Sequence, residues 1–502
     1  MQRLLPNGPR SRPFAFAAFC AAVYFAGGCA VALGPGYTVQ KQTLELRFVP
    51  SPKAYLSVHA SYDLKNSGNQ PLHSIRVLLP PASAFHRSST SARWNNQPVE
   101  IQVISTASPA DRGDIVELPL PTAWSVKQRH LLILDYELST GSHLGSFLAA
   151  SPESFFAYPG SWDPALLPPK HLFGTGGVPP KKWTLEVRVP AGYLVHSSGE
   201  AGKRTGSASE WTYSFTERPY GFAPFAAGGN YVESEWKPDG QSVVFWTFRS
   251  VDAAAAQKAA ASIATRIRYY ETEYGPPNKE DRTVRLLECV PPSEQFGCGA
   301  LPQTVLVHQN WVARGLTDPG FYEDADFELS YTWFGGASRV RFEESPLPMD
   351  ALAPYAGWEA QAFAVGGDAR AERIGTLIAD FDKDVTACKE KVILPLPASS
   401  SGCSYPAAWA KSGLFFFAFE DKVGRAPFHA ALKELLESRR GRDFSLEDLI
   451  AAADRESQQP QGAFVRAWLK HSGIPDDFRA RYSRAATSST GSEPNSAKEP
   501  QP

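Results

Sequence analysis

The chain has 502 residues, enough for about two to four domains, with 43% hydrophobic residues, 20% charged residues and a net charge of −2 at neutral pH. This composition is that of a globular protein with an ample core. The charge argues against a general nucleic-acid binder, because neutralising phosphates requires clustered lysine and arginine.

The first 29 residues are typical of an export signal. Three arginines precede an apolar run at 14–28, and the small residues AGG stand directly before Cys29. This pattern resembles a bacterial lipobox, in which the cysteine is lipidated after cleavage. A plain signal peptide remains an alternative, and so does an uncleaved anchor, since residues 14–34 are about long enough to span a bilayer. All three interpretations place the body of the protein outside the cytoplasm, and the first two attach it to a membrane of the cell envelope, facing the periplasm or the exterior.

Residues 38–240 are predicted to form an all-β domain of sandwich or saddle type. The strand at 55–64 alternates, with apolar residues such as Tyr62 on one face and polar residues such as His59 on the other. Turns rich in proline and glycine separate further predicted strands, which lie at 73–80, 130–138, 183–190 and 211–217.

Residues 241–480 are predicted to form a second domain that is α/β at first and then helical. A strand at 242–250 precedes a helix at 252–275, with Asp252 as its N-cap and Gly275 past its end. The remaining elements are expected to be strands at 283–291 and 304–310, followed by helices at about 321–338, 350–365, 367–383, 405–424, 427–439, 445–455 and 461–472. The polar tail at 483–502 is expected to be disordered.

Four cysteines outside the N-terminal segment are expected to form disulfides in an oxidising compartment. Proximity favours pairing Cys289 with Cys298 and Cys388 with Cys403, although three pairings are possible. A zinc site made of these cysteines is disfavoured, because the sequence holds no C-x-x-C spacing.

The segment DFELSYTWFGG (326–336) is similar to a peptidase zinc helix. In H-E-x-x-H followed by W-F-G, two histidines one turn apart bind zinc and the glutamate activates the bound water. Glu328 and the Trp-Phe-Gly are present here, but Phe327 and Tyr331 stand at the histidine positions. Eighteen residues separate Tyr331 from Asp350, the spacing at which a glutamate would be the third ligand.

This order of parts resembles the aminopeptidase-N-like gluzincins, the membrane alanyl aminopeptidase family of zinc metallopeptidases. The resemblance implies a multidomain fold, with the β-domain followed by a thermolysin-like α/β-then-α-helical domain. It also implies that Trp409 replaces the tyrosine that stabilises the oxyanion, and that Pro302 replaces the glutamate that binds the substrate amine. The implied substrate groove is lined by Gly299, Ala300, Leu301, Pro302 and Gln303.

The replaced residues predict a loss of zinc. Phenylalanine has no lone pair for a metal, and an unperturbed tyrosine loses its proton only near about pH 10. We therefore expect no metal, no other cofactor and no catalytic residues. The predicted function is that of a non-catalytic envelope protein that binds a peptide or protein partner in the former active-site groove. Two alternatives remain: a metal-independent hydrolase using Glu328 as base with Asp350, and a lipoprotein component of a membrane complex.

Overall fold

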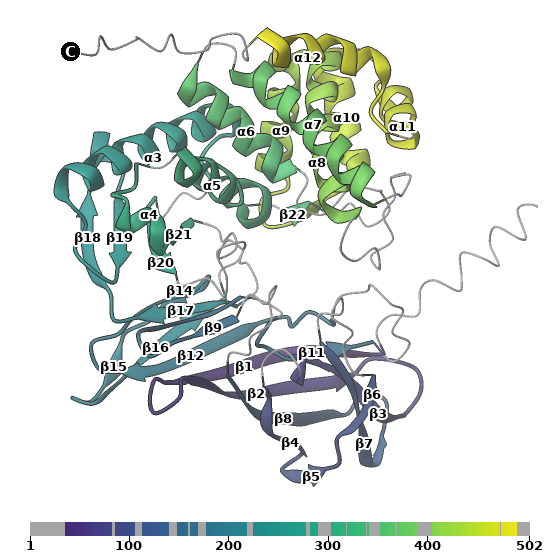
Figure 1. The fold of residues 1–502 in the computed structure, drawn as a ribbon. Helices are drawn as coiled ribbons and strands as arrows, with labels where there is room; N and C mark the ends of the chain where they lie inside the picture. The colour runs from purple at the N-terminus through teal and green to yellow at the C-terminus, as the bar shows by residue number, and fades with distance from the viewer. Residues whose placement is uncertain are drawn as a thin grey trace, which may run out of the picture.

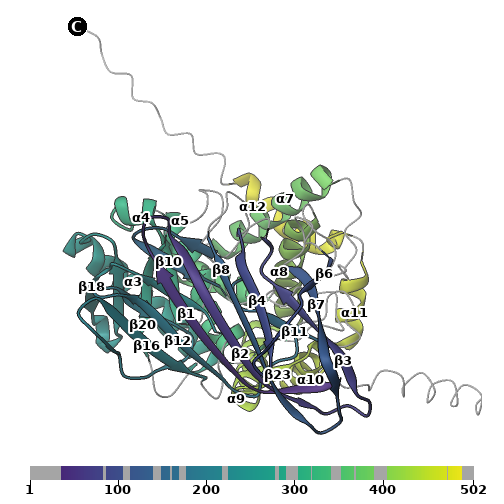
Figure 2. The ribbon, with the colours of Figure 1, turned by 90° about the horizontal axis from the view of Figure 1, so that it is seen from below.

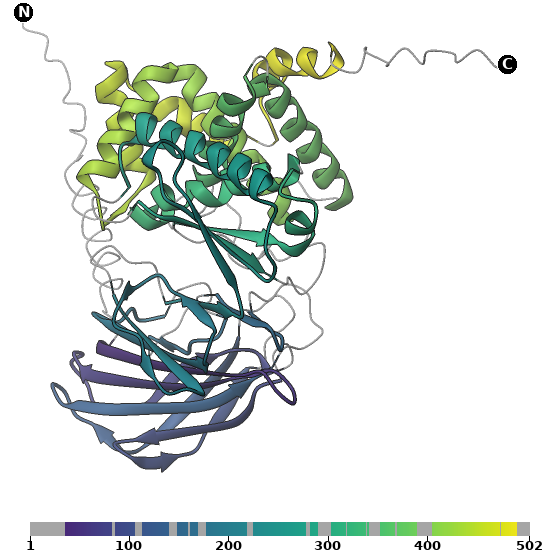
Figure 3. The ribbon, with the colours of Figure 1, turned by 90° about the vertical axis from the view of Figure 1, so that its left-hand side faces the viewer.

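The protein, described here by a computed structural model, consists of a β-rich domain followed by a helical domain (Figure 1). A four-stranded sheet covered by a long helix lies between the two (Figure 3). The structure describes residues 36–82, 86–105, 113–139, 148–158, 161–168, 177–217, 224–277, 282–289, 303–317, 319–337, 339–340, 352–366, 369–388, 404–471 and 473–488.

The β-domain contains one large sheet and two small ones. The large sheet has nine strands in the order β14-β16-β12-β1-β2-β8-β4-β5, with β15 beside β16, and its central strands lie side by side in Figure 2. The small sheets have the orders β11-β3-β7-β6 and β13-β17-β10-β9. The strands are β1 (Tyr37–Val49), β2 (Tyr55–Asn66), β3 (Leu72–Leu79), β4 (Ser88–Trp94), β5 (Gln97–Val99), β6 (Gln102–Ser105), β7 (Asp114–Trp124), β8 (Arg129–Leu138), β9 (Leu148–Ala150), β10 (Ser154–Ala157), β11 (Ala165–Leu167), β12 (Trp183–Pro190), β13 (Leu194–His196), β14 (Glu200–Ala201), β15 (Thr205–Gly206), β16 (Glu210–Thr216) and β17 (Ala226–Gly229).

The alternation predicted for β2 is present. Its buried face includes Ala60, which pairs with Leu44 of β1 and Leu134 of β8. On the opposite face, His59 lies 2.5 Å from Asp135. Apolar residues on one face and paired polar residues on the other fix the register of the sheet.

The four-stranded sheet between the two domains, called the second sheet below, has the order β18-β19-β20-β21. Its last three strands are parallel. Its strands are β18 (Val232–Trp236), β19 (Val243–Thr247), β20 (Val284–Cys289) and β21 (Thr304–His308). Helix α3 (Ala253–Tyr274) connects β19 to β20. As predicted, Asp252 caps this helix by accepting the Ala255 N–H at 2.9 Å, and Gly275 follows its end with φ of 78°. Among the strands that the structure describes, β21 forms one edge of this sheet.

Helices dominate the rest of the chain and share one apolar core with α3. Helix α8 contributes its phenylalanine-rich stretch at 414–419, which is fully buried. The elements are η1 (Pro238–Gly240), α4 (Gln309–Ala313), α5 (Pro319–Ser330), the π-helical turn η2 (Thr332–Ala337), β22 (Arg339–Val340), α6 (Leu352–Val365), α7 (Ala369–Cys388), α8 (Ser404–Val423), α9 (Arg425–Ser438), β23 (Asp443–Phe444), α10 (Leu446–Ser457), α11 (Gly462–Lys470) and α12 (Asp476–Ser488).

An apolar interface joins the β-domain to the second sheet. Phe225 and Tyr231 cluster with Trp246 and Leu306, and the His196 ring bonds the Thr304 hydroxyl at 2.9 Å. This interface covers the face of the sheet that presents Val244, Trp246, Leu287 and Leu306.

The structure differs from the predicted elements in several places, of which three bear on the argument. The strand predicted at 304–310 ends at His308, where α4 begins, and the helix predicted at 321–338 gives way to a π-helical turn after Ser330. Helix α12 was not predicted and extends to Ser488, six residues into the segment at 483–502 that was expected to be disordered. The reason is tertiary, because Phe478 of α12 is buried beside Trp468.

We predict that Gly413→Ala destabilises the fold by about 1–3 kcal/mol, although alanine is the better helix former. A Cβ at Gly413 would lie 2.1 Å from a ring carbon of Trp358, which itself stacks on Phe417. Denaturant unfolding measures the change. Gly462→Ala is the matched control, because its Cβ would meet only the end of the Arg466 side chain. Equal stability of both variants would contradict the prediction.

Candidate functional site

Helix α5, which carries the motif similar to a zinc helix, is fixed by buried contacts to α3. Asp326 forms an ion pair with Arg266, and both side chains are almost fully buried. The Tyr270 hydroxyl donates to the Asp326 carbonyl at 2.6 Å. Just beyond α5, the Trp333 indole N–H donates to the Gly275 carbonyl at 2.7 Å. The motif is therefore held at both ends.

Phe327 and Tyr331, at the predicted ligand positions, form an aromatic pair. Their ring centroids lie 5.2 Å apart with the planes at 81°, an edge-to-face geometry that aromatic rings favour. Gly357 of α6 lies so close that a Cβ there would be 3.0 Å from the Phe327 Cα. Neither ring supplies the imidazole nitrogens of a tetrahedral zinc site. These residues therefore do not fit the metal that the resemblance implies.

Glu328 lies between the two rings in sequence and points to strand β21. Its side chain is buried, with 4% exposed, and its carboxylate accepts the backbone N–H of Leu306. One turn further on, the Thr332 hydroxyl accepts the backbone N–H of Gln303 at 2.8 Å. Two positions four residues apart thus bond the strand edge. Their spacing was visible in the sequence, but the strand that they contact was not.

The structure describes only some of the other predicted site residues. Gln303 directly precedes β21, whereas residues 299–302, Asp350, Cys298 and Cys403 lie outside the described residues. Cys388 and Trp409 lie in α7 and α8, but their side chains are not among those described. Cys289 is disulfide-bonded, and its pairing with Cys298 stays a prediction.

Lys411, two residues after Trp409, is fully buried in α8. Its ammonium donates to the His471 carbonyl at 2.5 Å and faces the Trp468 ring. Burial lowers the pKa of Lys411 to about 8. This lysine ties α8 to the C-terminal end of α11, where a cation is favourable.

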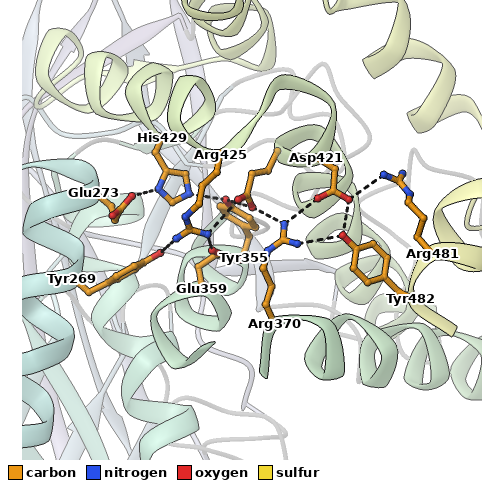
Figure 4. A network of polar contacts seen from close by, with 11 residues as sticks. Tyr269, Glu273, Tyr355, Glu359, Arg370, Asp421, Arg425, His429, Arg481 and Tyr482 are labelled. Atoms are coloured by element: carbon orange, nitrogen blue, oxygen red, sulfur yellow. Dashed lines mark hydrogen bonds and ion pairs between the residues drawn. The ribbon is translucent and has the colours of Figure 1, made fainter. Parts of the chain in front are cut away.

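A second polar cluster lies inside the helical domain (Figure 4). Its side chains come from α3, α6, α7, α8 and α9 and, at the surface, from α12. Sequence reasoning missed this cluster. Two of its glutamates lie in otherwise apolar stretches, a signal that could have indicated buried ion pairs. Its members are Tyr269, Glu273, Tyr355, Glu359, Arg370, Glu420, Asp421, Arg425, His429, Arg481 and Tyr482.

Two glutamates and two arginines form a closed ring in this cluster. Arg370 lies 2.9 Å from both Glu359 and Glu420, and Arg425 contacts the same two carboxylates. Burial and the neighbouring Glu420 raise the pKa of Glu359, and the arginines oppose them. Ligand atoms of Glu359, Glu420 and His429 lie within 4.8 Å of one another. A cation among them would nevertheless face two guanidiniums, so the geometry is that of an ion-pair ring.

We predict that Arg266→Met costs about 3–5 kcal/mol of stability, because it leaves the Asp326 carboxylate buried without its charged partner. Arg268→Met on the same helix is the control, since its ion pair with Asp239 is exposed. Denaturant unfolding of both variants checks the prediction, and equal effects would contradict it.

Comparisons with known proteins agree at the level of the fold. No protein-family model matches the sequence, and no curated protein sequence matches it. Solved structures do match. An M1 zinc metallopeptidase from Deinococcus radiodurans is 18% identical, with a TM-score of 0.55, over 88% of this chain and 95% of that one. Native yeast LTA4 hydrolase is 13% identical, with a TM-score of 0.63, over 88% of this chain and 69% of that one.

These similarities confirm the predicted architecture, a β-rich domain followed by a helical domain. At such low identity they concern the fold, since function depends on the residues of a site. The chain therefore has the fold of the M1 zinc metallopeptidases.

Proposed function

We propose that this chain is a non-catalytic relative of the M1 zinc metallopeptidases and works as a binding or scaffolding protein of the cell envelope. The observation that carries the proposal is the packed ring pair of Phe327 and Tyr331 on α5. Without imidazoles at these positions, one face of the helix lacks the nitrogen ligands of a zinc site. The proposal therefore includes no zinc and no other cofactor.

The contacts of Glu328 support a structural role for this residue. A general base must reach a substrate or a water molecule, but this carboxylate is buried and accepts the Leu306 N–H. Metal-free hydrolysis by Glu328 with Asp350 is therefore the less supported alternative, and Asp350 lies outside the described residues.

We propose a peptide or protein as the partner, bound beside α5 and the Gly299–Gln303 segment. The backbone N–H groups of Gln303 and Leu306 already bond to Thr332 and Glu328. An extended peptide cannot use these donors to add as a strand. We therefore expect recognition through side chains. A lipoprotein role in a membrane complex remains the second alternative, and it requires a co-purifying membrane protein.

We predict that the full chain, purified in detergent, carries no stoichiometric zinc and cleaves no aminoacyl naphthylamide. The variant Phe327→His/Tyr331→His/Asp350→Glu restores the ligand types of the family. It is expected to bind about one zinc ion per chain, because the helix spacing is kept. Elemental mass spectrometry and a chromogenic assay provide the measurements.

The control for this experiment adds Glu328→Gln to the rebuilt variant. It should bind zinc like the rebuilt variant, and any hydrolysis that the rebuilt variant shows should be lost in it, because the base is absent. Stoichiometric zinc with chelator-sensitive turnover in the unaltered chain would end the proposal. A rebuilt variant that folds without binding zinc would contradict the relation of α5 to a metal site.

We also propose that the chain is held in the envelope by lipid on Cys29. The support is the sequence pattern before this cysteine. Within the part of the chain that the structure describes, no helix is long and apolar enough to cross a bilayer.

We predict that Cys29→Ser abolishes incorporation of labelled palmitate and moves the chain out of the membrane fraction, because the thiol that carries the lipid is lost. Cys20→Ser is the matched control and should leave both unchanged. Membrane retention of unlabelled Cys29→Ser would favour the uncleaved anchor.

A further inference from the structure

The chain enters the β-domain at one corner of its large sheet. The Gly36 carbonyl accepts the backbone N–H groups of Ser67 and Gly68, at 3.1 and 2.7 Å, so the start of β1 is fixed beside the turn that follows β2. The segment from Cys29 to Gly36 is short, and even when fully extended it reaches at most about 25 Å. A lipid on Cys29 therefore holds this corner near the membrane, and so does an uncleaved anchor that ends at residue 34.

Basic side chains lie around this corner on β2 and β8. Lys65 and Arg129 are direct cross-strand partners, so two like charges lie side by side on the same face of the sheet. In the adjoining turn, the Lys127 backbone N–H donates to the Asn66 carbonyl at 2.9 Å. Lys127 and Arg129 are exposed, and Lys65 is half-buried. These positive charges therefore stand next to the point at which the chain enters the domain.

Lysines continue this group on β1 and just before β12. The Gln42 backbone N–H donates to the Lys182 carbonyl at 2.9 Å, which places Lys182 beside β1 near Lys41. The ammonium of Lys181 donates to the Gln40 side chain at 3.2 Å. We call the whole group the basic corner, and its members are Lys41, Lys65, Lys127, Arg129, Lys181 and Lys182.

The basic corner differs from the rest of this sheet in how its charges are paired. Further along β12, Arg188 lies 3.0 Å from Glu45 and 3.8 Å from Glu186, so its charge is balanced. Within the residues that the structure describes, no carboxylate oxygen lies within 4.0 Å of a lysine ammonium of the basic corner. These lysines are therefore available to a negatively charged partner.

Acidic residues offset the charge of the corner only in part. Asp63 lies 3.8 Å from Arg129, and both side chains are largely exposed, so this pair is weak. Glu200 of β14 and Glu217 after β16 stand on the flanking strands. The corner therefore keeps an excess of positive charge.

We propose that the basic corner docks on the anionic lipid headgroups of the membrane that holds the N-terminal anchor. The proposal rests on the anchoring proposed above and adds to it a second surface with a partner of its own. Anionic lipids attract lysine and arginine within about one Debye length, roughly 10 Å. The short tether confines the corner to the neighbourhood of the membrane, where this attraction acts.

The position of the corner favours a lipid surface over a protein partner. The membrane is the partner that the tether itself brings to these lysines. An anchor combined with a basic surface is also a common way to strengthen membrane attachment. Docking gives the chain a fixed orientation on the membrane, in place of free movement about its tether.

Lysine reactivity of the full chain in vesicles tests the proposal. The chain is reconstituted into vesicles of phosphatidylcholine alone, or with about one third anionic phosphatidylglycerol. A water-soluble amine reagent then modifies exposed lysines, and mass spectrometry measures each of them. In the anionic vesicles the reactivity of Lys41, Lys127 and Lys182 should fall about fivefold, because the headgroups hold these side chains and exclude the reagent. High salt should abolish this protection, because it screens the attraction.

Lys53 is the internal control. It is exposed in the turn between β1 and β2, at the opposite end of these strands, and should react equally in both kinds of vesicle. Flotation in a density gradient measures anchoring separately. A chain that floats with the vesicles but whose corner lysines react equally in both would overturn the docking and leave the anchoring intact. A chain that floats with neither kind of vesicle would overturn both.

A charge variant gives a second readout. In Lys41→Gln/Lys127→Gln/Lys182→Gln the protection of Lys181 by anionic vesicles should be lost, because its basic neighbours are gone. Lys53→Gln is the matched control and should keep the protection. Undiminished protection of Lys181 in the triple variant would contradict docking by charge. Protection of the corner lysines in native envelopes but not in anionic vesicles would point to a protein partner and overturn the proposal.

Discussion

The hydrogen bond between the Glu328 carboxylate and the Leu306 backbone N–H is the contact on which the arrangement around α5 depends. A carboxylate buried to this degree needs donors, and an edge strand has N–H groups that the sheet leaves unpaired. Each group satisfies the other. Thr332 repeats the arrangement one turn later with the N–H of Gln303. The helix is thereby tied to the strand through the glutamate that a zinc peptidase would use for chemistry. Glu328 thus has a structural reason to be present even without hydrolysis.

The contacts that stabilise the fold do not depend on the residues that would catalyse hydrolysis. Its fold matches M1 zinc metallopeptidases at less than a fifth identity. The contacts that position α5, such as the Arg266–Asp326 pair and the bond from Trp333 to Gly275, are complete without a metal. In the helical domain, the ring of Glu359, Glu420 and the two arginines joins α6 to α9 in the same self-sufficient way. Stability and the proposed loss of catalysis are therefore compatible.

The sequence predicted features set by local patterns. Alternation located β2, and capping residues located α3 between Asp252 and Gly275. The motif spacing placed Phe327 and Tyr331 on one helix face. The Leu306 contact of Glu328 could not be predicted, since it depends on which strand forms the sheet edge. The ion-pair cluster around His429 was missed because its members lie far apart in sequence. Helix α12 was missed because tertiary contacts of Phe478 stabilise a segment whose composition is polar.

The central claim is that no divalent metal binds beside Glu328. The most direct measurement is an anomalous difference map, recorded at the zinc edge, from crystals of the full chain grown with added zinc. The account predicts no peak within bonding distance of the Glu328 carboxylate, with the rings of Phe327 and Tyr331 in contact and the Leu306 N–H bonded to the carboxylate. A strong peak coordinated by Glu328 would contradict it.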